Sequence, residues 1–226
     1  MVKAAVKLIQ FDLDGTLIDS VPQLHLAVNA MLAELGRAPA NVEAVRGWVG
    51  NGADILVRRA LLAGEKTGYE PTDIEQAQAR AAFDSAYERV ADRQLVFYPG
   101  VQEVLWRLHR AGFILAIVTN KPSRFVPAIL AAAGMSELFS LVLGGDCLPE
   151  KKPSPAPLLH VCTHFDMDPG QCLMVGDSEN DVLAAKAAGM PVAGLSYGYN
   201  YGRPIAESDP DWVMDDFSQL ADLLLA

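Results

Sequence analysis

The aspartates are the residues of this chain best suited to chemistry, because they gather in two short clusters that are far apart in the sequence. The clusters are Asp12-Leu13-Asp14-Gly15-Thr16 and Gly176-Asp177-Ser178-Glu179-Asn180-Asp181. At neutral pH an ordinary carboxylate is ionised and can act as a nucleophile, as an acid–base group or as an oxygen ligand for Mg²⁺. The two clusters are therefore the candidate catalytic centre.

Both clusters follow apolar runs that are typical of buried strands, Val6–Phe11 and Cys172–Val175. In an open parallel sheet, ligands bind outside the carboxyl ends of the strands, which is where both clusters would lie. Residues two apart on an extended chain project to the same side, so Asp12 and Asp14 can face one ligand. Gly15 then permits a sharp turn.

Four motifs in order resemble the signatures of the haloacid dehalogenase superfamily, whose members are mostly phosphatases. The first is Asp12-Leu13-Asp14-Gly15-Thr16 at the end of a strand, and the second is Thr119-Asn120 after the apolar run Phe113–Val118. Lys152-Pro153 follows in a loop, and the Gly-Asp-Ser-x-x-Asp cluster comes last. Because the motifs span essentially the whole chain and each lies at a predicted strand end or loop, chance agreement is a poor explanation.

The resemblance implies a reaction through an aspartyl-phosphate. In that scheme Asp12 is the nucleophile, and Asp14 is the general acid that protonates the leaving alkoxide and then accepts a proton from the hydrolytic water. Thr119, Asn120 and Lys152 would bind the phosphoryl group and neutralise its oxygens.

The same resemblance implies Mg²⁺ as the cofactor. Its expected ligands are the Asp12 carboxylate, the backbone carbonyl of Asp14 and the Asp177 carboxylate, since Mg²⁺ prefers hard oxygen ligands. Asp181 is expected to orient Lys152 or a metal-bound water. Further positive charge could come from Lys121, Arg124 and Lys151, for which a solvated surface is an equally open reading.

The second half of the chain alternates helical and strand patterns. Predicted helices at Val101–Arg110, Phe125–Ala133 and Val182–Ala188 each end at an Ala-Gly pair, as glycine suits the position after a helix. Apolar runs then follow, and they are Phe113–Val118, Leu141–Leu143, Pro191–Leu195 and a short one near Trp212-Val213. This alternation predicts an α/β fold with a doubly wound, Rossmann-like parallel sheet.

The first half breaks this pattern between about Ile18 and Leu95, where helices and no convincing strand are predicted. Thr72-x-x-Glu75 is typical of a capping box that begins a long helix. We therefore expect residues 18–95 to form a helical cap domain, and residues 1–17 together with 96–226 to form the catalytic core. In the resemblance, such a cap closes over the substrate and determines specificity.

The segment Arg46–Ala53 contains three glycines around a tryptophan, which predicts a tight loop above a small ligand. Trp48, Gly50 and Asn51 are the candidate specificity residues of the cap. This segment resembles phosphoglycolate phosphatases within the superfamily, as does Gly198–Gly202, although Ser154 stands where many relatives have histidine. The implied substrate is a small phosphorylated carboxylic acid, 2-phosphoglycolate, and packing between cap helices is the alternative for Trp48.

Other functions remain open at this stage. A sugar phosphomutase of the β-phosphoglucomutase type shares the core motifs and differs in its cap. Another small-molecule phosphatase or a pyrophosphatase would also fit, and a catalytically idle binding protein could use the same fold.

Composition sets limits on partners and compartment. The formal charge of −10 disfavours nucleic acid and an anionic membrane as main partners. At 226 residues and 51% hydrophobic, the chain can bury a large core, yet it has no apolar stretch of the ~20 residues that a membrane helix needs. Three cysteines without a Cys-x-x-Cys pair disfavour disulfides and zinc. We expect a cytoplasmic protein, either a monomer or a homodimer.

Overall fold

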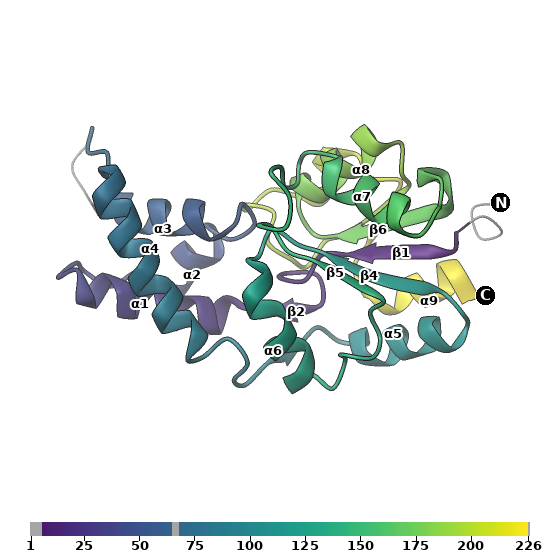
Figure 1. The fold of residues 1–226 in the computed structure, drawn as a ribbon, viewed down its shortest axis with the longest axis horizontal. Helices are drawn as coiled ribbons and strands as arrows, with labels where there is room; N and C mark the ends of the chain where they lie inside the picture. Colours follow the sequence, from purple (N-terminus) through teal and green to yellow (C-terminus); the bar gives the residue numbers. More distant parts are fainter. Residues whose placement is uncertain (1–5, 65–67, 226) are drawn as a thin grey trace.

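A parallel sheet forms the centre of the structure, a computed structural model that describes residues 6–64 and 68–225 (Figure 1). The order of the strands in this 6-stranded sheet is β5-β4-β1-β6-β7-β8, and all neighbouring strands are parallel. The strands are β1 (Leu8–Phe11), β4 (Ile114–Val118), β5 (Leu141–Leu143), β6 (Cys172–Gly176), β7 (Val192–Leu195) and β8 (Trp212–Met214). The predicted doubly wound sheet is confirmed.

Strand β1 lies in the middle of the sheet, and all of its residues are buried. Helices cover a parallel sheet on both faces, so a central strand must be apolar on both sides. Phe11 at the end of β1 is in register with Ile117 of β4 and Val175 of β6. The residues that follow these three strands therefore emerge side by side at one edge of the sheet.

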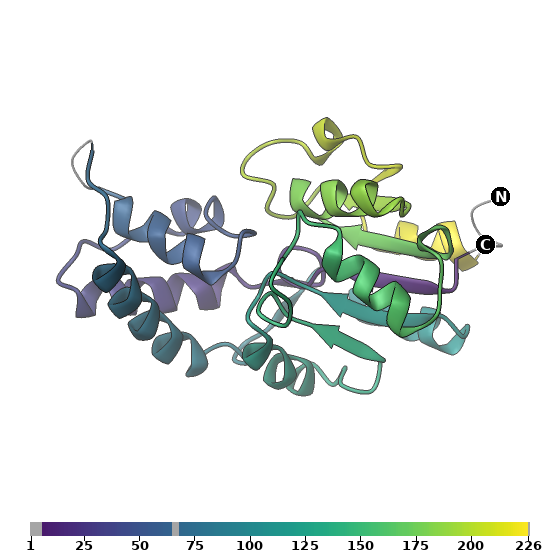
Figure 2. The same ribbon diagram turned by 45° about the horizontal axis from the view of Figure 1, so that its top comes forward.

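Helices cover both faces of the sheet (Figures 1 and 2). On one face lie α5 (Val101–Arg110), α6 (Val126–Ala132) and α9 (Ser218–Leu225), and on the other lie α7 (Ala156–His164) and α8 (Glu179–Ala188). Each face has its own apolar cluster. Phe11 points into the first together with residues of α5, α6 and α9, whereas Leu8 points into the second with residues of α7 and α8. Because successive side chains of β1 point to opposite faces of the sheet, this strand packs against both layers of helices.

A second group of helices lies beyond the carboxyl ends of the strands (Figure 2). It consists of α1 (Val21–Glu34), α2 (Val42–Arg46), α3 (Ala53–Leu62) and α4 (Asp73–Glu88). The capping box that begins α4 is formed as expected, because Thr72 and Glu75 exchange hydrogen bonds between side chain and backbone. The helices stand where a cap would cover the sheet edge, while the domain limits given above remain a prediction.

The expectation that no strand lies between Ile18 and Leu95 was wrong. Strand β2 (Ile18–Asp19) pairs antiparallel with β3 (Val96–Phe97) in a small second sheet. The two strands are the points where the chain leaves the sheet layer for the helices and returns from them. Two residues are too few to show an alternating pattern, so the pairing depends on tertiary proximity and has no local signal.

Short 3-10 helices complete the secondary structure, and these are η2 (Ser123–Phe125), η3 (Pro169–Gln171) and η4 (Ile205–Ser208). Within residues 6–64 and 68–225, no helix combines the length and apolar character required to cross a bilayer.

Candidate active site

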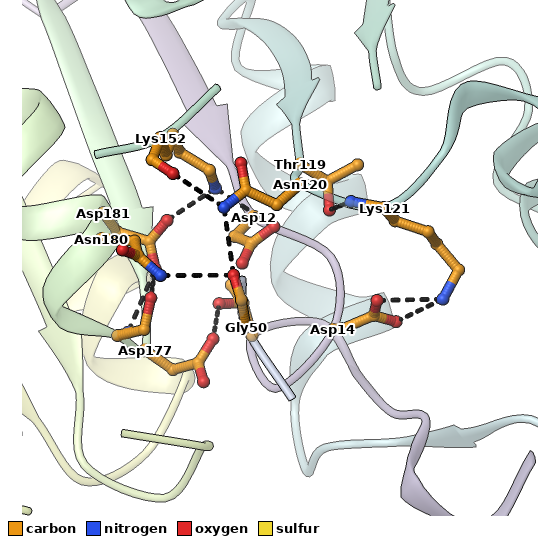
Figure 3. Close-up of polar contacts among 12 residues, drawn as sticks. Asp12, Asp14, Gly50, Thr119, Asn120, Lys121, Lys152, Asp177, Asn180 and Asp181 are labelled. Carbon is orange, nitrogen blue, oxygen red and sulfur yellow. Dashed lines mark hydrogen bonds and ion pairs between the residues drawn. The ribbon is translucent and has the colours of Figure 1, made fainter. Parts of the chain in front are cut away.

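Three buried carboxylates meet at the carboxyl edge of the sheet (Figure 3). Asp12 follows β1, Asp177 follows β6, and Asp181 lies in the first turn of α8. One oxygen of each lies within 4.8 Å of the others. The register of β1 and β6 brings the two sequence clusters together, so the predicted convergence of Asp12 and Asp177 is seen in the structure.

Lys152 supplies positive charge to this cluster. Its Nζ lies 2.6 Å from Asp181 Oδ1 and 3.2 Å from Asp12 Oδ1, and the residue is 2% exposed. Burial alone would lower the pKa of Lys152, but the two carboxylates together raise it. The lysine is therefore a fixed cation beside Asp12.

The cluster still carries more negative than positive charge. Burial raises the pKa of Asp12 to about 6, although Lys152 opposes this shift. Burial, Asp181 and Asp12 also raise the pKa of Asp177 well above its ordinary value. Three carboxylates with one ammonium group leave a deficit of positive charge in a buried site.

These residues fit a hard divalent cation. Asp12 Oδ1 is buried and forms no hydrogen bond of normal geometry with the described residues, although Lys152 lies nearby. Its free lone pair and the neighbouring carboxylates of Asp177 and Asp181 offer the oxygen donors that Mg²⁺ prefers. The carboxylate of Asp14, in contrast, lies outside this cluster and contacts Lys121.

Backbone and side-chain donors fix the Asp177 carboxylate. Thr16 Oγ1 donates to Asp177 Oδ1 at 2.6 Å, and the Tyr199 N–H donates to Asp177 Oδ2 at 2.6 Å. Gly198 must be glycine here, because an added Cβ would lie 2.3 Å from Asp177 Oδ2. The loop after β7 therefore packs directly onto the candidate metal ligand.

Asp181 has two structural partners besides the carboxylate cluster. Its Oδ2 accepts hydrogen bonds from the Ser178 N–H at 3.0 Å and the Ser178 hydroxyl at 2.8 Å, which forms the capping box of α8. Its Oδ1 accepts from Lys152. The helix terminus thereby orients the carboxylate that holds the lysine.

The second motif lines the cavity beside Asp12. The Thr119 hydroxyl accepts a hydrogen bond from the Lys121 N–H at 3.2 Å, which leaves its own proton available for a ligand. The Asn120 side chain instead donates to the carbonyls of Lys152 at 2.9 Å and Gly50 at 3.0 Å. Asn120 therefore links the sheet edge, the lysine loop and the cap loop.

Asp14 and Lys121 form a buried ion pair that sequence reasoning did not identify. Lys121 Nζ donates to Asp14 Oδ1 at 2.8 Å and to Asp14 Oδ2 at 2.9 Å, and Lys121 is 5% exposed. Arg124 differs, since its half-exposed side chain pairs with Asp84. The sequence offered one sign that Lys121 belongs to the site, because this lysine directly follows Thr119-Asn120 at a strand end.

The candidate specificity residues of the cap occupy different positions. Gly50 lines the cavity, and its carbonyl also accepts a hydrogen bond from Asn180 at 3.2 Å. Trp48 does not belong to the cavity lining and packs against the first apolar cluster. Asn51 also lies outside the lining, with its Oδ1 buried and without a hydrogen-bond partner in the described parts of the chain.

The cavity lies between the sheet edge and the helices above it. Its polar wall comes from the motif residues, and its apolar wall comes from α1, α3, α4 and the segment after β4. The lining residues are Asp12, Asp14, Leu24, Val49, Gly50, Gly52, Ala53, Leu56, Phe83, Tyr87, Thr119, Asn120, Lys121, Pro122 and Phe125. The volume open to the centres of water molecules is about 40 Å³, which favours a small ligand.

Comparisons with known proteins agree with this geometry. The family model of haloacid dehalogenase-like hydrolases matches residues 6–189. A phosphoglycolate phosphatase of Psychrobacter arcticus is 52% identical over 220 residues, with 97% of this chain and 96% of the relative covered. One from Haemophilus influenzae strain 86-028NP is 51% identical over 219 residues, covering 96% of this chain and 98% of the relative.

A solved structure has the same fold over nearly the whole chain. It is the crystal structure of a predicted phosphoglycolate phosphatase from Haemophilus somnus 129PT, with a TM-score of 0.92 and 45% identity. The alignment covers 97% of this chain and 98% of that one. The fold, the four sequence motifs and the similar proteins thus all indicate the same protein family.

Proposed function

The chain belongs to the haloacid dehalogenase-like hydrolases, and on that premise we propose that it is a phosphatase that converts 2-phosphoglycolate and water into glycolate and phosphate. Relatives about half identical over nearly their full length bear that activity as their name. The structural observation that carries the proposal is the buried Asp12 beside Lys152, at the bottom of a small cavity.

Asp12 is the nucleophile in this proposal. One carboxylate oxygen attacks phosphorus, the bond from phosphorus to the glycolate oxygen breaks, and an aspartyl-phosphate forms. Lys152 and the Thr119 hydroxyl stabilise the negative charge on the phosphoryl oxygens, because both are held in fixed positions at the sheet edge. Asn120 acts by positioning, since its side chain ties the Lys152 loop to the cap.

Asp14 is the acid–base group. It donates a proton to the departing glycolate oxygen, and the resulting carboxylate then accepts a proton from the water that attacks the aspartyl-phosphate. That attack releases inorganic phosphate and restores Asp12 in its ionised form. The two aspartates have different neighbours: Asp12 lies with Asp177 and Asp181 beside Lys152, and Asp14 pairs with Lys121. In the proposed cycle Asp14 leaves this ion pair and takes up a proton from solvent before it acts as the acid.

Mg²⁺ is the proposed cofactor, with Asp12, Asp177 and the Asp14 backbone carbonyl as ligands. When bound, it would offset the repulsion between an anionic nucleophile and an anionic phosphate ester. Asp181 keeps Lys152 in place from its position at the start of α8.

A cytoplasmic setting fits the state of the cysteines. Cys147, Cys162 and Cys172 are all free thiols, as expected in a reducing compartment. There the enzyme would recycle the two-carbon phosphate left by oxygenation reactions or by repair of DNA 3′ ends.

Phosphate release from a panel of esters tests the proposal. The panel contains 2-phosphoglycolate, p-nitrophenyl phosphate, glucose phosphates, AMP and pyrophosphate, each with Mg²⁺ and with EDTA. We expect hydrolysis that requires Mg²⁺ and prefers 2-phosphoglycolate. Broad hydrolysis without that preference would contradict the substrate, and absence of hydrolysis would contradict the reaction.

A further inference from the structure

Lys121 is a buried cation whose ammonium group lies beside Asp14, away from that of Lys152 (Figure 3). Its ammonium group donates to both oxygens of Asp14 and lies 4.7 Å from the centre of the Tyr87 ring. Removing an ammonium group from water costs free energy, and a partner with opposite charge offsets part of that cost. A second buried cation so close to the catalytic aspartates therefore needs a functional explanation.

Three arginines near the cap loop already have partners elsewhere. Arg46 pairs with Asp19, Arg58 pairs with Glu70, and Arg59 donates to the Trp48 carbonyl at 2.7 Å. Among the described residues that line the cavity, Lys121 has the one cationic side chain. Lys121 is also paired, with Asp14, but its position in the lining makes it the cation placed to meet a second anionic centre of a bound ligand.

Tyr87 is a second polar group beside Lys121 in the cavity lining. It is 2% exposed and lines the cavity from α4, and its hydroxyl lies beside the Lys121 ammonium group with no other hydrogen-bond partner in the described parts of the chain. Buried hydroxyl groups in proteins usually both donate and accept hydrogen bonds where an acceptor is within reach. A ligand oxygen between this hydroxyl and the Lys121 ammonium group would satisfy both donors.

We propose that Lys121 is a specificity-determining residue that receives the carboxylate of the substrate, and that this carboxylate takes the place of Asp14 on the lysine. The inference rests on the proposed function, because it concerns the non-reacting end of 2-phosphoglycolate. The phosphoryl group lies at Asp12 and Lys152, and the carboxylate lies between Lys121 and Tyr87. One end of the ligand is then held by the sheet edge and the other by the sheet edge and the cap together.

The exchange of partners links recognition to chemistry. In the free enzyme both oxygens of Asp14 are held by Lys121. A substrate carboxylate that binds Lys121 releases the Asp14 side chain, which can then turn toward the leaving oxygen. An ester without a carboxylate leaves Asp14 on the lysine, so it is turned over slowly as well as bound weakly.

A charge-removal experiment separates this role from a structural one. The Lys121→Met variant is assayed with Mg²⁺ on 2-phosphoglycolate and on ethyl phosphate, which has the same two carbons and no carboxylate. We expect kcat/KM for 2-phosphoglycolate to fall about 100-fold, and kcat/KM for ethyl phosphate to stay the same or rise, because the variant also frees Asp14 from the lysine. The control variant Lys186→Met removes an exposed lysine that pairs with Asp209, and it should change neither ester.

Equal losses on both esters would overturn the inference, since a merely structural lysine does not distinguish them. If Lys121→Met fails to fold, Lys121→Gln removes the charge, keeps a polar side chain that can donate a hydrogen bond, and serves the same comparison. Failure of the wild-type enzyme to hydrolyse 2-phosphoglycolate is a separate outcome, which would overturn the proposed function instead.

Binding measurements test the exchange itself without turnover. The ligands are 3-phosphonopropionate, the methylene isostere of the substrate, and propylphosphonate, which lacks the carboxylate, and titration calorimetry is done with Mg²⁺ present. Asp14→Asn removes the group that competes for Lys121, so it should tighten 3-phosphonopropionate at least about threefold more than propylphosphonate. An equal change for both ligands would show that no exchange takes place.

Discussion

The Gly50 carbonyl of the cap loop accepts a hydrogen bond from the Asn180 side chain at 3.2 Å, across the boundary between the helices and the sheet edge. The same amide nitrogen of Asn180 lies 2.8 Å from the Tyr201 hydroxyl. Asn180 therefore belongs to the second aspartate cluster in sequence, yet contacts the loop that covers the cavity. It is suited to hold the cap loop closed over a ligand.

Replacing Asn180 tests this contact. In Asn180→Ala the Gly50 carbonyl loses one donor, worth about 1 kcal/mol, so the closed arrangement is less favoured. We expect KM for 2-phosphoglycolate to rise about fivefold while kcat changes less. Asn29→Ala is the matched control, because Asn29 donates to the Ala40 carbonyl inside the cap. A similar rise in KM in both variants would argue against a specific role in closure.

Asp12→Asn tests the nucleophile. The amide cannot attack phosphorus, so turnover of 2-phosphoglycolate should fall by at least about 1000-fold. The variant should remain folded, since Asp12 Oδ1 forms no hydrogen bond in the described structure and the cluster loses an unfavourable charge. Circular dichroism checks the fold and phosphate release checks the rate. Turnover near the wild-type value would exclude Asp12 as the nucleophile.

Gly198→Ala tests whether close packing of the loop after β7 holds the Asp177 carboxylate in place. The new methyl group would lie 2.3 Å from an Asp177 oxygen, so the carboxylate or the loop must move. We expect weaker Mg²⁺ binding and a fall in kcat of about 10–100-fold, as misplaced supporting groups of a metal site commonly cause. Gly170→Ala is the control, since nothing lies within 4 Å of its added Cβ. Unchanged Mg²⁺ affinity in Gly198→Ala would contradict the tight packing.

Trp48 was the sequence candidate for substrate discrimination, but its side chain packs against the apolar cluster and does not line the cavity. We therefore expect Trp48→Ala to lower the free energy of unfolding by about 2 kcal/mol, less than for a fully buried tryptophan. The order of preference among phosphate esters should remain the same. A reordered preference at unchanged stability would return Trp48 to the role that the sequence suggested.

The sequence predicted the sheet and the convergence of Asp12 with Asp177 because both depend on local patterns. Apolar runs identify strands, and the rule that ligands bind at the carboxyl ends of parallel strands brings the two residues together. The pair of Lys121 and Asp14 has no such pattern. The two residues are far apart in the chain, and a lysine two positions after Thr119 could equally have pointed to solvent.

The contact between Asn180 and Gly50 was unpredictable for a related reason. It depends on how the helices of residues 18–95 sit on the sheet edge, which no local periodicity encodes. The short pairing of β2 with β3 is similar, since it arises where two chain crossings run side by side. Sequence patterns thus identified the chemistry, and tertiary structure determined which polar groups support it.

The extent to which Mg²⁺ stabilises the folded protein should depend on pH. Burial raises the pKa of Asp12 from 3.8 to about 6, so between those values the folded protein holds a proton that the unfolded chain has lost. The free energy of unfolding therefore falls as pH rises through this window, by about 3 kcal/mol for this one group. Asp177 contributes in the same direction, because its pKa is also raised.

Mg²⁺ replaces the protons on these carboxylates, so it should stabilise the protein more at pH 8, where no protons compete, than at pH 5. Thermal unfolding with Mg²⁺ and with EDTA at both pH values measures the difference. Other groups titrate in the same range, and Asp12→Asn controls for them: its Mg²⁺-induced shift in Tm should be smaller and should depend less on pH. A shift in wild type that is equal at pH 5 and pH 8 would show that Mg²⁺ does not bind at the raised carboxylates.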